Sequence, residues 1–330
     1  LMNGGIISGL KAPTLASTNI TWEKVYTTNI GLDWTMLNGR FTGSFDYYIR
    51  DTKGMVVNKT YPAVLGTTGG KENLADMRTK GMELSLTWND QIKDVAGSPL
   101  DYSISIGISD NTSEITKYDN PTLSLDETHY QGKKIGEIWG YVTDGFIKDE
   151  AEAQEMANKQ AFISTTWKPG DIRYADLNGD GKISKGASTL DDHGDLKVIG
   201  NSTPRYFFGI DLNADWKGFD VRLFFQGVMK RDYWGKDNFC GYLFGARGDK
   251  DIWHARGLVE HQDYFRAQAI GIDGHEIPAN LDAYYPRPVF KEGAKNQEIQ
   301  SRYLQDASYI RLKNFQLGYT LPAKWMKNIG

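Results

Sequence analysis

Hydrophobic and polar residues alternate along seven separate stretches of the chain, and this period of two residues is the dominant pattern of the sequence. In residues 22–37, for example, Ile30, Leu32, Trp34 and Met36 alternate with small or polar residues. The same period recurs at residues 40–50, 81–88, 102–109, 205–216, 219–226 and 308–321. Because successive side chains of a strand point to opposite faces, this period predicts seven β-strands, each with one apolar and one polar face.

The last of these stretches changes phase part of the way along. Ile310 and Leu312 lie in one phase, whereas Phe315 and Leu317 lie in the other. One extra residue in a strand restores the facing of the side chains that follow it. We therefore predict a β-bulge near Lys313-Asn314.

The connections between the predicted strands alternate in length. Short links lie at residues 38–39, 89–99 and 217–218. Long connections span residues 51–80, 118–203 and 227–306, and the charged, alanine-rich residues 150–159 predict one short helix within them. Asn38-Gly39 accepts positive φ and favours a tight hairpin turn. Short turns on one side and long loops on the other are typical of an up-and-down barrel in an outer membrane.

The two faces of the predicted strands differ in chemistry. The apolar face is rich in Tyr, Trp and Phe near the strand ends, as interfacial girdles are. The other face carries Asp33, Asp46, Glu83, Asp211, Asp215, Asp220 and Arg222. These charges suit a water-filled lumen, whereas the core of a soluble β-sandwich, the alternative fold, could not accept them unpaired. We therefore predict an all-β, antiparallel up-and-down transmembrane β-barrel with long extracellular loops.

Composition narrows the classes of function. The 330 residues carry a net charge of −4 and show no basic stripe, which argues against a nucleic-acid partner. Cys240 is the single cysteine, so an intrachain disulfide or a thiolate metal site cannot be built. No Ser-His-Asp order, paired-carboxylate cleft or phosphate-cradling glycine loop stands out, and we expect no enzyme. Apolar runs of about 18 residues are absent, but strands that span a membrane need only alternate apolar residues.

Residues 176–183 match the first half of a calcium loop. Asp176, Asn178 and Asp180 place three oxygen-bearing side chains at alternate positions, and the Lys182 carbonyl is a candidate fourth ligand. The position that supplies the closing glutamate of an EF-hand is Ala187. A longer loop would therefore have to close on one of three later acids, Asp191, Asp192 or Asp195. The prediction is one structural calcium ion, and the alternative is a solvated acidic turn.

Aromatic residues gather in the long connections. They could stack on sugar rings or contact a partner, or simply hold the loops together. The candidates for contact with substrate or partner are Trp139, Tyr233, Trp234, Tyr242, Trp253, Tyr284 and Tyr285.

Several short motifs follow one another along nearly the whole chain. They are residues 73–78 leading into 81–85, Trp139-Gly140-Tyr141 with Asp144-Gly145-Phe146, Pro169-Gly170-Asp171 with 176–183, 199–206, Gly218-Phe219-Asp220, Phe225-Gln226-Gly227 and 303–314. In this order they resemble the C-terminal half of SusC/RagA-type TonB-linked (TonB-dependent) outer-membrane proteins of Bacteroidetes. The likeness rests on seven separate motifs and is therefore specific.

This resemblance implies more than the strand pattern does. It implies a plugged barrel of about 22 strands, with the plug, the TonB box and the first strands before residue 1 and a closing strand after residue 330. Residues 119–203 and 228–306 would be extracellular loops. The implied function is import across the bacterial outer membrane of glycans or oligopeptides, with a SusD-like surface lipoprotein as cap and the TonB complex as drive, acting through the region before residue 1. The alternative is a soluble, calcium-stabilised β-protein that binds carbohydrate through loop aromatics.

Overall fold

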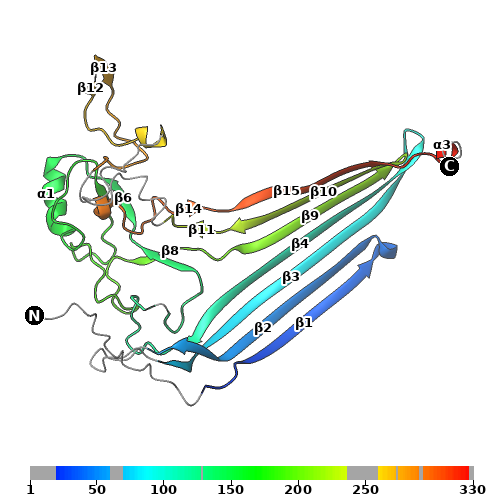
Figure 1. Cartoon of the computed structure of the whole chain (residues 1–330), viewed down its shortest axis with the longest axis horizontal. Helices are drawn as coiled ribbons and strands as arrows, with labels where there is room; N and C mark the ends of the chain where they lie inside the picture. Colours follow the sequence, from blue (N-terminus) through cyan, green and yellow to red (C-terminus); the bar gives the residue numbers. More distant parts are fainter. Residues whose placement is uncertain are drawn as a thin grey trace, which may run out of the picture.

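Seven long strands form one antiparallel sheet, in the order β1-β2-β3-β4-β9-β10-β15 (Figure 1). The computed structural model describes residues 20–59, 70–127, 129–235, 259–272, 274–289 and 293–326. Within these residues the strands are β1 Lys24–Met36, β2 Phe41–Asn58, β3 Lys71–Val95, β4 Ser98–Lys117, β9 Arg205–Trp216, β10 Phe219–Lys230 and β15 Tyr309–Tyr319. The seven predicted strands and their up-and-down order are confirmed.

Four strands, β2, β3, β4 and β10, are longer than the alternation predicts. The polar connection expected at residues 51–80 is wrong for most of its length, because β2 continues to Asn58 and β3 begins at Lys71. Charged cross-strand pairs occupy this part of the sheet, for example Arg78 Nε with Asp51 Oδ1 at 2.7 Å. Apolar residues are adjacent here, as in Met55-Val56-Val57, so these parts of the strands leave no alternating apolar signal in the sequence.

The turns at the other end of the sheet are short. They lie at the 3-10 turn Leu37–Gly39 and between the strand ends Val95 and Ser98, and Trp216 and Phe219. Each contains a glycine with φ between 81° and 87°, a conformation that costs glycine little. Figure 1 shows these turns together at one end of the sheet, and the short elements of the long connections gathered beyond the other.

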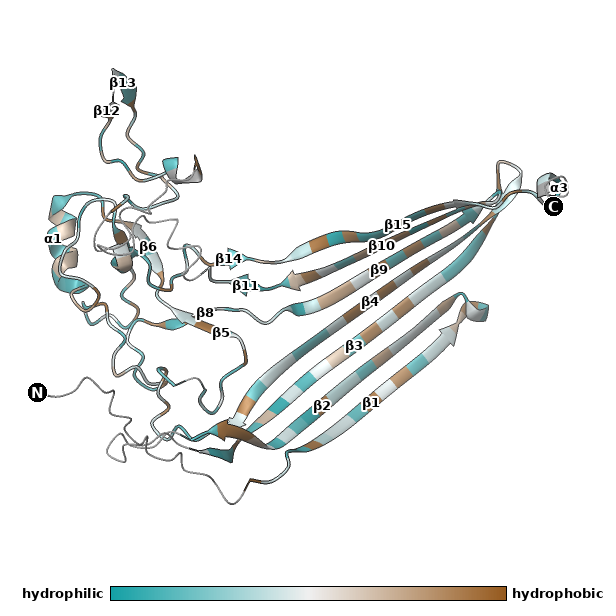
Figure 2. Cartoon of the chain, in the orientation of Figure 1, coloured by the Kyte–Doolittle hydropathy of each residue, from teal (hydrophilic) through white to brown (hydrophobic). Residues whose placement is uncertain are grey.

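Apolar side chains line up across all seven strands on one face. One complete row, read from the strand pairing, is Trp34, Gly43, Leu86, Ile106, Ile210, Phe225 and Leu312. In β9 every second residue from Phe208 to Trp216 is apolar, which is a span of nine residues. A strand needs about 9–11 residues to cross the hydrocarbon core of a bilayer. Figure 2 shows hydrophobic and hydrophilic bands alternating along these strands.

Aromatic rings concentrate on this face near the short turns. The Phe41 ring lies 6.3 Å from both the Trp34 and the Trp88 ring centroids, and Phe219 lies 4.5 Å from Tyr319. Aromatic residues at this level are typical of the boundary between lipid and water.

The predicted β-bulge in the last strand is confirmed. Phe224 of β10 pairs with Asn314, but the next residue, Phe225, pairs with Leu312. Lys313 is therefore the extra residue. It restores the apolar facing of Leu312 and Ile310.

On both faces of the sheet, side chains of one strand cover glycines of the next. Trp34 lies over Gly43, and on the polar face Tyr48 lies over Gly81, its direct partner in the strand pairing. Such cross-strand coverage compensates a glycine for its missing side chain.

This contact yields a prediction about Gly81. Gly81→Ala would place a Cβ within the Tyr48 ring, so the ring must move, and we expect a loss of stability of about 1–3 kcal/mol. The matched control is Gly107→Ala, because a Cβ on this strand glycine meets nothing within 4 Å. The measurement is the temperature at which the folded band disappears in unheated-versus-heated electrophoresis. Equal midpoints for the two variants would contradict the prediction.

The long connections carry their own short elements. The predicted helix is confirmed as α1 Glu150–Lys159, whose N-terminus is capped by the Asp149 side chain. The remaining elements pair as β5 Glu137–Gly140 with β8 Lys197–Asn201, β6 Thr143–Phe146 with β7 Ile172–Tyr174, β11 Asp232–Tyr233 with β14 Gln305–Asp306, and β12 Ile270–Ile272 with β13 His275–Ile277. The 3-10 turns Val259–Gln262 and Gly293–Asn296 and the short helix α3 Ala323–Met326 complete the described chain. None of its helices is long and apolar enough to cross a membrane.

Candidate functional site in the loop module

The two long connections fold against each other. We call the described residues of 118–203 and 231–306 the loop module. Its apolar core takes side chains from both connections: Tyr141, Phe146, Ile147, Ala153, Met156, Trp167, Ile172, Tyr174 and Ile183 from the first, and Phe265, Ala283, Tyr285 and Tyr303 from the second. The two long connections thus share one core, which neither of them builds alone.

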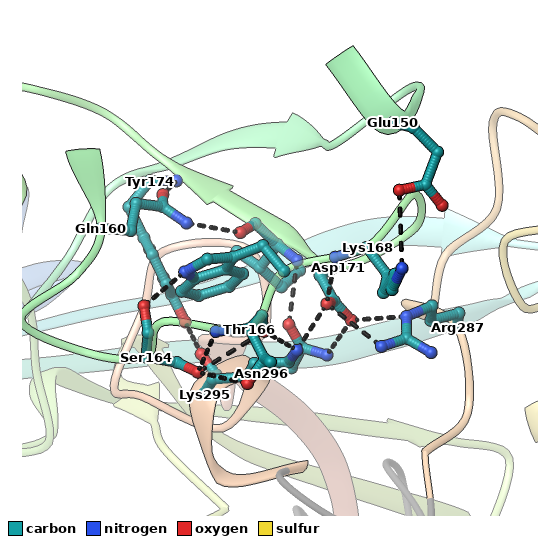
Figure 3. A network of polar contacts seen from close by, with 12 residues as sticks. Glu150, Gln160, Ser164, Thr166, Lys168, Asp171, Tyr174, Arg287, Lys295 and Asn296 are labelled. Atoms are coloured by element: carbon teal, nitrogen blue, oxygen red, sulfur yellow. Dashed lines mark hydrogen bonds and ion pairs between the residues drawn. The ribbon is translucent and has the colours of Figure 1, made fainter. Parts of the chain in front are cut away.

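A buried carboxylate joins the two connections (Figure 3). Asp171, in the first connection, is fully buried. Its Oδ1 accepts hydrogen bonds from Arg287 Nε at 2.9 Å and Asn296 Nδ2 at 3.0 Å. Its Oδ2 lies 2.7 Å from the Lys295 ammonium and accepts the Lys168 backbone N–H at 2.9 Å. Three side chains of the second connection thus converge on one anion of the first.

The Lys295 ammonium has further partners besides Asp171. The Lys295 side chain is 3% exposed, and its ammonium donates to the Thr166 carbonyl and lies 5.1 Å above the Trp167 ring. Asn296 also accepts the backbone N–H of Ile172 at 2.9 Å. The second connection therefore supplies a hydrogen-bond acceptor for a backbone N–H of β7, and buried polar groups need such partners.

The acidic loop closes on its own backbone. Asp176 accepts the N–H groups of Gly179 at 2.6 Å and Gly181 at 2.8 Å, and Asp180 accepts that of Lys182 at 2.7 Å. Asn178 Oδ1 accepts the N–H of Asp180 at 3.0 Å. The structure thus brings Asp176, Asn178 and Asp180 into one turn, as the spacing predicts.

The three candidate closing acids lie in different surroundings. Asp195 is fully buried and accepts the N–H groups of Leu177 at 2.7 Å and Ser184 at 2.8 Å, at either end of the loop. Asp192 accepts the Ala187 N–H at 3.1 Å instead, and Asp191 is exposed. Asp195 is thus the one of the three acids that bonds to the backbone at both ends of the loop. The described chain contains no group of three or more His, Cys, Asp or Glu side chains that could hold a metal.

The aromatic candidates do not form one surface. Tyr285 is buried and stacks on Tyr303, and Trp234 packs against the module core. Tyr233 and Tyr284 are exposed. Trp139 donates its indole N–H to Tyr130 Oη at 3.0 Å. Tyr242 and Trp253 lie outside the described residues.

Buried tyrosines of the loop module stay protonated across the ordinary pH range. Burial, together with the Glu137 carboxylate that accepts its hydroxyl hydrogen, raises the pKa of Tyr130. Burial likewise raises the pKa of Tyr303, whose hydroxyl donates to the Tyr284 carbonyl at 2.9 Å. These hydroxyls therefore serve as hydrogen-bonding groups and carry no charge.

A buried ion pair lies at the junction of the sheet and the loop module, and the sequence pattern did not predict it. Asp110 is 9% exposed and makes two 2.5 Å hydrogen bonds with the Arg205 guanidinium. β4 pairs with β9 only as far as Ser109, and beyond it Ile115 bonds to the backbone of residues 132–133. The sequence does contain one indication of it, because Asp110 is a charged residue in the same phase as the apolar residues of β4. The ion pair lies where β4 stops pairing with β9.

The strand pairing confirms the charged face. Asp211 pairs with Arg222 at 2.5 Å, and Asp101, Asp215 and Asp220 follow one another across three neighbouring strands. Neighbouring like charges are unfavourable unless water or a partner of opposite charge screens them. This face therefore suits a wet environment.

Comparisons with known proteins agree with this architecture. The family described as "TonB dependent receptor-like, beta-barrel" matches residues 2–326. "TonB-dependent receptor P3" of Formosa agariphila is 26% identical over 336 residues, covering 98% of this chain and 30% of that protein. "TonB-dependent receptor SusC" of Bacteroides thetaiotaomicron is 24% identical, covering 95% and 27%. The chain thus spans about 30% of the length of these relatives.

A solved structure has the same fold. The "RagAB peptide importer in the 'open-open' state" superposes with a TM-score of 0.62 at 22% identity, covering 93% of this chain and 29% of that one. At this identity the likeness concerns the fold. The seven-stranded wall and its loop module are therefore an arrangement that a larger protein also contains.

Proposed function

Because the chain belongs to the TonB-dependent receptor-like β-barrel family, we propose that it forms part of the wall and the extracellular loops of an outer-membrane importer of large nutrients. The observation that carries this proposal is the sheet, with one apolar face, one charged face, short turns at one end and a folded module at the other. An importer of this kind needs a lipid-facing outside and a wet inside.

The exposure of the apolar face favours a bilayer over water. Ile30, Leu32 and Leu317 are 71%, 62% and 65% exposed, and they belong to a continuous apolar surface across neighbouring strands. A soluble protein rarely leaves a surface of this kind uncovered. The soluble carbohydrate-binding alternative would need a cover for it, whereas lipid supplies one.

We assign glycans or oligopeptides as the cargo, a SusD-like lipoprotein as the partner at the loop module, and the TonB complex as the source of energy. Support comes from the relatives, whose names include "SusC" and "RagAB peptide importer". The partner would sit on the extracellular side, where the loop module lies beyond the end of the sheet (Figure 1).

Two measurements on cells that make the complete protein test this proposal. The protein should sediment with the outer membrane and leave it only in detergent, and uptake of its cargo should cease when TonB is deleted. A fully soluble, monomeric protein, or uptake that does not depend on TonB, would refute it.

A structural calcium ion in the acidic loop remains our proposal for residues 176–195. Oxygen ligands from Asp176, Asn178, Asp180 and the Lys182 carbonyl are the kind that calcium prefers. Asp195 would hold the two ends of the loop together through the backbone N–H groups that it accepts. The ion would stiffen the loop without taking part in any reaction.

We predict that replacing both Asp176 and Asp180 with Ala abolishes calcium binding and exposes the loop to proteolysis. The double variant removes two ligands and the carboxylate oxygens that accept three backbone N–H groups. Asp191→Ala is the matched control, since Asp191 is an exposed acid of the same segment that supplies no ligand in the proposed site. Calorimetric titration with calcium and timed digestion with and without chelator are the measurements. An unchanged titration in the double variant would show that the loop is only an acidic turn.

A further inference from the structure

A hollow of about 340 Å³ lies on the charged face of the sheet, across β2, β3, β4, β9 and β10. Gly107 and Gly209 are direct partners in the strand pairing, and because neither has a side chain, they leave room above the backbone. We call this space the wall hollow. Because β9 begins at Arg205, the wall hollow lies near the end of the sheet that adjoins the loop module (Figure 1). Its volume is at the lower end of the range for small-molecule sites.

Gly107 is a strand glycine that contacts within the described chain do not explain. A Cβ at Gly43, Gly81 or Gly209 would meet an aromatic ring of the neighbouring strand. A Cβ at Gly107 would meet nothing within 4 Å, and the φ angle of this glycine is not positive. Glycine in the interior of a strand weakens it and often marks the close approach of a ligand or of another backbone. Gly107 therefore points to an occupant of the wall hollow.

Two phenylalanines line one side of the wall hollow. Phe207 of β9 has the phase of Asp211, and Phe224 of β10 has the phase of Arg222, so both rings belong to the charged face. Phe224 lies over Gly209, whereas Phe207 is 39% exposed. An exposed ring on a face that suits water provides a flat apolar surface on which a ligand can stack.

The other side of the wall hollow is polar. Its polar side chains are those of Ser44, Asp46, Glu83, Ser85, Ser109 and Gln226. Asp46 and Glu83 are direct partners in the strand pairing, and the lining contains no cation. Within the described chain, Asp46 accepts a hydrogen bond from Asn29 Nδ2 at 3.1 Å, and the other five polar side chains bond to no other side chain. The wall hollow thus offers carboxylates, hydroxyls and an amide opposite two rings.

The spacing of the two sides fits one sugar ring. Glu83 pairs with Ser109, which pairs with Phe207, so two strand spacings of about 4.8 Å separate Glu83 from Phe207. A pyranose has an apolar face of C–H groups and a rim of hydroxyls, and it can stack on a ring while donating to carboxylates. An acidic sugar would be repelled by the two carboxylates, because the Arg222 guanidinium of this face is already paired with Asp211 at 2.5 Å.

We infer that the wall hollow binds one ring of a neutral glycan, which stacks on Phe207 and donates its hydroxyl hydrogens to Glu83 and Asp46. The inference rests on the proposed function and narrows its cargo. A basic peptide side chain, the rival ligand, would use the two carboxylates but would place its alkyl stem against the serine and glutamine groups, which would then lose water without gaining a partner.

Calorimetry on the complete protein in detergent tests the inference. The probes are three neutral trisaccharides (maltotriose, cellotriose and mannotriose), the acidic trigalacturonic acid and the basic peptide triarginine. We expect at least one neutral trisaccharide to bind, trigalacturonic acid not to bind, and triarginine to bind more weakly than the best neutral probe. Phe207→Ala should weaken the best neutral probe about tenfold, because the stacking surface is lost.

Two further variants separate hydrogen bonding from shape. Glu83→Gln should weaken the best neutral probe about fivefold, because a charge-assisted hydrogen bond becomes a neutral one. Gly107→Val should weaken it at least tenfold by filling the hollow, while the fold persists, because a Cβ at this position meets nothing. Ser103→Val is the matched control, since Ser103 lies on the same strand and face but outside the lining, and it should leave binding unchanged. The shift in electrophoretic mobility on heating checks that each variant is folded.

Three results would each overturn the inference: no binding of any neutral trisaccharide, tighter binding of triarginine, or neutral binding that Phe207→Ala and Gly107→Val leave unchanged. Uptake assays on cells that make the complete protein keep this failure apart from failure of the proposed function. TonB-dependent uptake by a protein whose wall hollow binds no sugar overturns the inference alone, whereas absence of TonB-dependent uptake overturns the importer.

Discussion

Replacing Asp171 with Ala is expected to separate the two halves of the loop module while leaving the sheet assembled. The variant removes the acceptor shared by Arg287, Lys295 and Asn296. Arg287 is partly exposed and can turn to solvent, but Lys295 is 3% exposed and would remain buried without its counter-charge. Breaking a buried pair from one side costs about 3–5 kcal/mol.

Hydrogen exchange is the measurement with the sharpest readout for this variant. The Ile172 N–H bonds to Asn296, and the Arg287 N–H bonds to the Gly170 carbonyl, so both amides report on the seam between the connections. We expect their exchange to accelerate by two orders of magnitude or more, since about 1.4 kcal/mol corresponds to tenfold. Strand amides of the sheet should be unchanged.

The same close-up contains a matched control. Lys168 and Glu150 form an ion pair of 3.6 Å whose side chains are 57% and 64% exposed (Figure 3). Exposed pairs contribute at most about 1 kcal/mol, so Glu150→Ala should leave exchange at the seam nearly unchanged. Equal exchange in Asp171→Ala and Glu150→Ala would show that the apolar core alone holds the connections together.

The second large effect concerns the orientation of the sheet. Ile106 lies in the complete apolar row, between Leu86 and Ile210. In the proposed barrel it faces the lipid, and Ile106→Arg should cost about 2–4 kcal/mol near the middle of the bilayer. The expected result is a large fall in the fraction of protein that reaches the outer membrane in folded form.

Ser105→Arg is the control, because it differs by one position and by face. Ser105 lies opposite Asp211 on the charged face, where a new arginine finds water and a counter-charge. We expect near-normal assembly. The folded fraction is measured by protease resistance and by the shift in electrophoretic mobility on heating. If Ser105→Arg were the damaging variant, the assignment of the lipid-facing side would be reversed.

Together these variants distinguish two kinds of stability in one chain. Strand pairing holds the sheet together within the chain. Many of its apolar side chains are exposed, so in the proposed barrel lipid would cover them. The loop module is held by an internal core and one buried anion. A partner or cargo that binds the module would therefore meet a preformed surface.

The sequence alone determined the strands wherever one face is apolar. Alternation placed all seven, the change of phase at Leu312 and Phe315 located the bulge at Lys313, and alanine-rich residues predicted α1. These features are local, because a period of two or an extra residue is visible within a few positions. The same reasoning failed at residues 51–58 and 71–80, where apolar residues are adjacent to one another and follow no period of two.

The candidate sites divide in the same way. The turn that joins Asp176, Asn178 and Asp180 follows from their spacing, because each side chain bonds to the backbone a few residues on. The tertiary structure alone decided three contacts: the bonds of Asp195 to the backbone at both ends of the acidic loop, the convergence of Arg287 and Lys295 on Asp171, and the meeting of Tyr141 with Ile299. In the Asp171 and Tyr141 contacts the partners lie more than 100 positions apart, and no local pattern links them. Short-range hydrogen bonds and side-chain periods are properties of a segment, whereas a buried charge acquires its partners only when distant segments share one core.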